Sequence, residues 1–261
     1  MLRTLVNAAV VAAFITVTAP PVHAAMHATD EFEAGATRPR SIAFLPPHAT
    51  LINRRIVQSE EQLEESVEFS AYLSASVQQA FAAQGDDVKV LTPQAVSADP
   101  ELQELVLDAD RRYAEILTQV RTKLPRQIGK RRYEAGDEMR VLAAKLGVDA
   151  IGFADLQMVS AAAGASAVAI LVGFGAAGTQ TMLSVSVIDG GTANIEAYFV
   201  PPIMRRGTIA GYDAIMADPA GKIGEITALT LRDLPPADPA ARAPAESDDE
   251  VLEDIESLLE N

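Results

Sequence analysis

The sequence contains no cysteine among its 261 residues. A disulfide therefore cannot stabilise the fold, and the chain has no thiolate nucleophile, no cysteine-ligated metal and no cysteine for lipid attachment. Stability must instead come from the burial of apolar side chains, which make up 49% of the residues. A chain of this length and composition can form one domain with appendages, or two small domains.

Histidine is also scarce, with three in the chain. A Ser-His-Asp triad in the mature protein would have to use His48, because His27 lies in a polar leader segment. The sequence after residue 24 has no G-x-S-x-G elbow, H-x-x-x-H motif or Asp-rich calcium loop. We therefore predict that His48 is a surface loop residue and that the protein has no catalytic residue, metal site or cofactor.

Positive charge is limited, since 21 Lys and Arg face 36 Asp and Glu and the formal net charge is −15. Nucleic-acid phosphates require a cationic surface, so this balance excludes DNA and RNA as expected partners.

Residues 1–24 have the pattern of a secretory signal peptide. Arg3 supplies a positive start, residues 5–19 are uncharged and mostly apolar, and Val22, His23 and Ala24 end in the small-residue pattern of a cleavage site. We predict cleavage near Ala24 and export to the periplasm. The alternative is an uncleaved anchor, although the apolar stretch is shorter than the roughly 20 residues that span a bilayer.

Residues 40–234 alternate between strand and helix patterns. Strands are predicted over 41–45, 88–91, 149–159, 181–188 and 192–200, and helices over 57–84, 101–123, 135–146 and 220–232. The order β-α-β-α-α-β-β-β-α predicts an α/β (α+β) domain with one mixed β-sheet flanked by helices. Early βαβ units imply parallel strands, and the turn at Asp189-Gly190-Gly191 implies an antiparallel hairpin. Residues 25–39 are predicted to be a flexible leader.

The stretch from residue 156 to 188 carries no charge and contains a G-x-G-x-x-G sequence at Gly173, Gly175 and Gly178. A dinucleotide loop would require a helix after its third glycine, whereas residues 179–188 alternate like a strand. A membrane span over about residues 161–178 is disfavoured because this run is mostly Ala, Gly and Ser. We favour a Gly/Ala-rich connection over residues 161–180. The residues with which it could contact a membrane or a second copy are Ile170, Leu171, Val172 and Phe174.

Two further segments are candidates for protein binding. One is a basic cluster at and after the end of the helix predicted over 101–123. It consists of Arg121, Lys123, Arg126, Lys130, Arg131 and Arg132, of which the last four are the candidate contacts. The other is the C-terminal end, where a Pro/Ala linker over 235–246 leads to an acidic amphipathic helix over 247–261. Its apolar stripe consists of Val251, Leu252, Ile255, Leu258 and Leu259. A lone helix this short is marginally stable in water, so we expect this flexible tail to become ordered against a partner or against the basic cluster.

Four short motifs give this chain a family resemblance. They are Ser-Ile-Ala-Phe-Leu-Pro-Pro at 41–47, Val-Lys-Val-Leu-Thr-Pro at 88–93, Ala-Ala-Lys-Leu-Gly-Val-Asp-Ala-Ile at 143–151, and Ser-Val-Ser-Val-Ile-Asp-Gly-Gly-Thr at 184–192. In this layout residues 40–232 resemble the group of bacterial envelope proteins that includes CsgG, LpoB and the N-terminal domain of TolB. The resemblance implies an α/β domain and an accessory role in secretion, surface assembly or cell-wall synthesis. Many members are lipoproteins, but this chain has no cysteine to lipidate.

The leading hypothesis is therefore an exported, non-enzymatic accessory protein that binds other envelope proteins in the periplasm. The alternative is a membrane-associated or oligomeric pore subunit, a homo-oligomer in contact with the membrane through residues 161–180 and not through a lipid anchor. A hydrolase that acts on envelope material is a more distant alternative.

Overall fold

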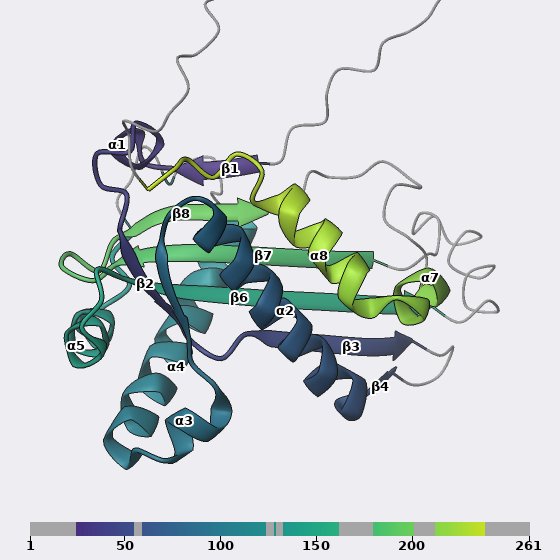
Figure 1. Cartoon of the computed structure of the whole chain (residues 1–261). Coiled ribbons are helices and arrows are strands. Elements are labelled where there is room, and N and C mark those ends of the chain that lie inside the picture. The colour runs from purple at the N-terminus through teal and green to yellow at the C-terminus, as the bar shows by residue number, and fades with distance from the viewer. Residues whose placement is uncertain are drawn as a thin grey trace, which may run out of the picture.

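The computed structural model describes residues 25–54, 59–123, 128, 133–161, 180–200 and 212–237. In this part of the chain a mixed β-sheet lies between two layers of helices (Figure 1). The predicted α/β fold is thereby confirmed. Each predicted strand and helix is present with shifted ends, and the structure adds short elements that the sequence patterns did not predict.

The sheet has the strand order β1-β8-β7-β6-β2-β5. Strand β2 (Ser41–Phe44) lies between β5 (Asp87–Val90) and β6 (Ala150–Ala161) and is parallel to both. Strands β7 (Gln180–Asp189) and β8 (Ile195–Val200) continue the sheet in antiparallel orientation. At the turn between them the Asp189 carboxylate accepts hydrogen bonds from the backbone N–H groups of Gly191 and Thr192, at 3.1 and 2.6 Å. The expected combination of parallel strands and a late hairpin is thus present.

Strand β3 (His48–Arg54) continues the line of β2 after Pro46 and Pro47. It pairs in parallel with the second half of β6, whose first half pairs with β2. The last residues of β3 pair with the short strand β4 (Ser59–Glu61). The prediction that His48 lies in a loop is therefore wrong. The two prolines interrupt the ladder, since they lack an N–H group, but the chain resumes pairing directly after them.

Helices α2 (Leu63–Ala83), α7 (Tyr212–Ala217) and α8 (Pro219–Thr230) cover one face of the sheet (Figure 1). The apolar residues of α2 recur every three or four positions, so Phe69, Leu73, Val77 and Phe81 are fully buried. On the sheet beneath them, a Cβ at Gly152 would lie 2.5 Å from the Phe44 ring. Only glycine allows this close approach of ring and strand.

Helices α3 (Pro93–Ser97), α4 (Pro100–Lys123) and α5 (Asp137–Leu146) form the layer on the opposite face. Tyr113 of α4 stacks on Phe153 of β6 with ring centroids 3.9 Å apart. Helix α5 ends at Gly147, whose positive φ of 68° permits the left-handed turn into β6. The three helices gather over one end of the sheet (Figure 1).

The segment predicted as a flexible leader is instead part of the domain. Strand β1 (Ala25–Ala28) pairs with β8, and helix α1 (Asp30–Glu33) follows it. Phe32 is fully buried and contacts Phe199 edge-on, at a centroid separation of 6.4 Å. Burial of one large aromatic side chain contributes about 2 kcal/mol or more to docking of this segment, and the pairing of β1 with β8 adds backbone hydrogen bonds.

The domain also extends beyond residue 234, where the sequence predicts the start of a linker. Pro235 and Ala237 are buried, and the Ala237 N–H donates to the Gln84 carbonyl at 2.9 Å. The N-terminal and C-terminal segments of the domain are therefore held at the same end of α2.

Candidate binding face of the sheet

Three polar side chains lie in a row across β3, β6 and β7, on the face that α4 covers in part. His48 is the register partner of Asp155, and Asp155 is the register partner of Ser184. The residues next to them in the three strands, Ala49, Ala154 and Leu183, belong to the core under α2. Since side chains alternate along a strand, His48, Asp155 and Ser184 all lie on the opposite face. His48 is largely exposed, Asp155 is half-buried and Ser184 is buried.

Helix α4 borders this row. Its Asp110 carboxylate lies 3.9 Å from the Nε2 atom of His48, and its Tyr113 hydroxyl is hydrogen-bonded to the Ser186 hydroxyl at 2.5 Å. The pKa of His48 is raised, first by the hydrogen bond to Asp110 and also by the negative charges of Asp110 and Asp155, against the effect of partial burial. The protonated imidazole is thus favoured where α4 meets β3.

The row contains the residue types of a hydrolytic triad but in an order that such a triad cannot use. A Ser-His-Asp triad requires the histidine to contact both the serine and the acid. Here the strand of Asp155 lies between those of His48 and Ser184. Two strand spacings separate histidine and serine, about 10 Å. His48 therefore cannot take a proton from Ser184 in this arrangement.

Beyond the row, no described helix covers this face of the sheet. The next row consists of Thr50, Gln157 and Met182, and the one after it includes Ile52 and Val159. None of these five residues belongs to either hydrophobic core of the described chain. Met182 is 49% exposed, and the other four are half-buried. We call these five residues the open face.

The open face carries no charge and combines apolar side chains with one amide and one hydroxyl. It lies at the end of the sheet where β6 stops at Ala161 and β7 starts at Gln180. A surface of this kind can bury apolar area against a partner without desolvating an ion, which would be costly.

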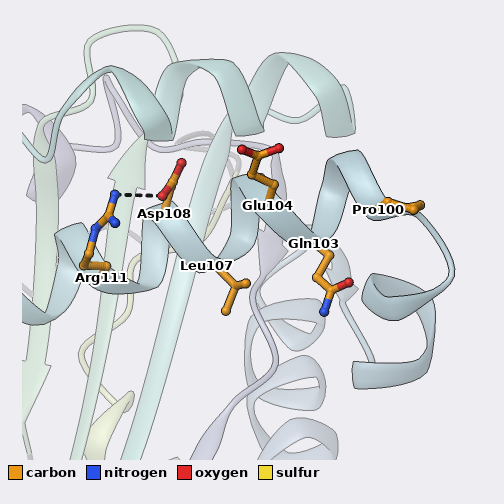
Figure 2. A pocket seen from close by; sticks show the side chains of 6 residues that line it. All are labelled: Pro100, Gln103, Glu104, Leu107, Asp108 and Arg111. Atoms are coloured by element: carbon orange, nitrogen blue, oxygen red, sulfur yellow. Dashed lines mark hydrogen bonds and ion pairs between the residues drawn. The ribbon is translucent and has the colours of Figure 1, made fainter.

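A separate shallow hollow lies on the outer side of α4. All six residues that line it come from this one helix: Pro100, Gln103, Glu104, Leu107, Asp108 and Arg111 (Figure 2). Asp108 and Arg111 form an ion pair at 2.7 Å, and both side chains are exposed. No second element encloses the hollow in its lining, so it lacks the convergent polar groups of a small-molecule site.

Sequence patterns gave no indication of a buried ion pair between Arg38 and Asp86. The guanidinium of Arg38 contacts Asp86 at 2.5 Å, and neither side chain is exposed. Arg38 also lies 5.3 and 5.4 Å from the ring centroids of Phe32 and Phe81, and its Nε–H donates to the Pro235 carbonyl at 3.1 Å. We call this group the clasp, because it joins α1, α2 and the C-terminal segment.

Most of the predicted site residues lie outside the described chain. These are the basic residues Arg126, Lys130, Arg131 and Arg132, the Gly/Ala residues Ile170, Leu171, Val172 and Phe174, and the tail residues Val251, Leu252, Ile255, Leu258 and Leu259. Their roles remain predictions. For the glycine motif, β7 begins at Gln180, two residues after Gly178, where a dinucleotide site would require a helix.

Among the described residues, no helix is both long and apolar enough to cross a membrane. The same part of the chain contains no cluster of three histidine or carboxylate side chains placed to hold a metal ion. Comparisons with protein-family models, curated proteins and solved structures found no match.

Proposed function

We propose that this chain is an exported, non-enzymatic accessory protein of the bacterial envelope that binds other proteins in the periplasm. The observation that carries the proposal is the open face, a part of the sheet that the described helices leave uncovered. The pattern of a signal peptide and the envelope-family resemblance of the sequence support export and an accessory role.

The chemistry of the open face favours a protein partner with an uncharged, apolar contact surface. Met182 and Val159 offer apolar area, while Gln157 and Thr50 can form hydrogen bonds that fix the orientation of a partner. His48, Asp155 and Asp110 lie along the border, where exposed charges contribute to specificity more than to affinity. The acidic tail over 247–261 would be a second, movable binding element.

Site-specific photocrosslinking tests this role. A photoreactive residue at Met182 should crosslink a discrete protein partner in intact cells of the native host, because Met182 is the most exposed member of the open face. The same residue at Val141 of α5, which is 52% exposed, is the matched control. Equal crosslinking at both positions, or none at Met182, would contradict a binding role for the open face.

Repeating the Met182 crosslinking on a chain that lacks residues 246–261 separates the two binding elements. If the tail recruits the partner, its removal should reduce the crosslink at Met182. An unchanged crosslink would show that the open face acts without the tail.

A second candidate function is that of a membrane-associated or pore-forming assembly subunit. The register of β6 and β7 favours it, because Val159 pairs with Gln180 and the two strands end side by side. A two-residue turn could join them, yet residues 162–179 lie between them and carry no charge. We expect an inserted segment to keep the protein in the membrane fraction after extraction with alkaline carbonate, and complete release would rule insertion out.

A further inference from the structure

The first half of α2 exposes two large apolar side chains on one side of the helix. Leu63 is 68% and Val67 is 73% exposed, more than any other large apolar residue of the described chain. They are four positions apart, so they are neighbours on the helix surface. Single exposed apolar residues are ordinary, but an adjacent pair forms a continuous apolar surface. The start of α2 lies beside β4, at the edge of the sheet (Figure 1).

Carboxylates border this pair. Glu61, Glu64 and Glu68 are exposed and Glu65 is half-buried. Among the described residues none of the four forms an ion pair, and Glu68 accepts the Tyr72 hydroxyl at 2.6 Å. The apolar pair is therefore bordered by four carboxylates that are not paired with any cation whose side chain the structure describes.

We propose that Leu63 and Val67, with Glu61, Glu64 and Glu68 around them, form a docking site for a basic amphipathic helix of a partner protein. Such a helix would bury an apolar stripe on Leu63 and Val67 while its lysines or arginines pair with the glutamates. We call this surface the α2 shoulder.

The negative charges of the α2 shoulder favour a basic partner helix over two alternatives, a second copy of this chain and an anionic membrane. A second copy docked shoulder to shoulder would place glutamates against glutamates, and like charges in an interface cost several kcal/mol. An anionic membrane surface would be repelled for the same reason. Positive charge on the partner is thus required, and the two apolar side chains require that it also present an apolar stripe.

The α2 shoulder is distinct from the open face, because α2 packs on the opposite side of the sheet. The inference goes beyond the proposed function by adding a second surface of different chemistry. A partner bound at Met182 and a basic helix bound at α2 could be present together. The two proposals can also fail separately.

A synthetic amphipathic peptide of leucine and lysine, roughly 20 residues long so that it can form a helix, is the probe. Fluorescence anisotropy of the labelled peptide should show binding to the wild-type chain. Leu63→Ser with Val67→Ser should weaken binding by about tenfold or more, because the apolar contact is lost. Glu64→Gln with Glu68→Gln should weaken it several-fold and reduce its dependence on salt.

Leu107→Ser is the matched control, since Leu107 is 61% exposed and lies between Glu104 and Asp108 on α4 (Figure 2). It offers a lone apolar side chain among acids in the other helix layer, so its loss should leave peptide binding unchanged. A peptide of the same composition with a scrambled, non-amphipathic order should bind more weakly. Equal binding of the scrambled peptide, or undiminished binding to the Leu63 and Val67 variant, would overturn the proposal.

Discussion

Replacing Arg38 with alanine is expected to lower the free energy of unfolding by about 3–5 kcal/mol, the cost of removing one partner of a buried ion pair. Asp86 would remain without exposure to solvent and without its cation. The guanidinium also fills the space between Phe32 and Phe81, so its removal leaves a cavity as well as a charge. Chemical denaturation of the purified chain measures the loss.

The clasp joins the first and last described segments of the domain, which gives the Arg38 variant a second readout. Thr29 and Thr37 donate hydroxyl hydrogen bonds to the Glu196 carboxylate at 2.7 and 3.1 Å, and Pro235 accepts from Arg38. We expect hydrogen exchange to accelerate first at residues 25–38 and 234–237, before it does in β6 and β7. Exchange that accelerates uniformly would contradict a local role for the clasp.

The pH dependence of this variant follows from the environment of Asp86. Burial raises the pKa of Asp86 to about 6, against the opposing effect of Arg38. A raised carboxyl pKa stabilises the fold at low pH, and that contribution is lost as the pH rises through about 6. Without Arg38 the pKa of Asp86 should rise further. The deficit of the variant should therefore be largest above neutral pH and shrink on acidification.

Two controls separate charge from packing in the clasp. Arg111→Ala removes a largely exposed cation that pairs with Asp108, and exposed pairs contribute little, so we expect almost no change. The double substitution Arg38→Met with Asp86→Leu keeps apolar volume and removes both charges. It should be far more stable than Arg38→Ala. If the double substitution is equally destabilised, the shape of the guanidinium and not charge pairing would hold the two segments together.

The main strands and helices could be predicted because their signals are local. Residues 42–44 and 150–154 are apolar on both faces, as expected for strands covered by helices on each side, and both segments are buried. Helix α4 repeats its apolar residues at helical spacing, so Val106, Ala109, Tyr113 and Ile116 are buried. Neither inference needs knowledge of a distant partner.

What could not be predicted depends on partners far away in the sequence. Phe32 is the one large apolar side chain of α1, and its burial requires Phe199. Arg38 is one basic residue in a polar segment, and its burial requires Asp86 and the Pro235 carbonyl. The open face arises because α4 covers only part of a long sheet, which strand patterns alone cannot reveal. The basic cluster, the Gly/Ala connection and the acidic tail stay predictions.

The outer edge of β3 is hydrogen-bonded to two serine side chains of α2. The Ala49 N–H donates to the Ser70 hydroxyl at 3.0 Å, and the Leu51 N–H donates to the Ser66 hydroxyl at 3.1 Å. The hydrogen bond of the Leu51 amide is buried and that of the Ala49 amide is partly buried, so water has limited access to these amides as an alternative partner. These hydroxyls take the place of a neighbouring strand, because the short β4 pairs only with the last residues of β3.

Ser66→Ala with Ser70→Ala should therefore lower the free energy of unfolding by about 2–4 kcal/mol, since each buried unpaired amide costs about 1–3 kcal/mol. Ser74→Ala is the matched control, because the Ser74 hydroxyl donates to the Ser70 carbonyl of its own helix at 2.7 Å and serves no strand. Each of the three serine-to-alanine substitutions gains helix propensity. The difference in the free energy of unfolding between the variants therefore reports the loss of the hydrogen bonds to the β3 amides. Equal stability of the double variant and Ser74→Ala would show that the hydroxyls do not close the sheet.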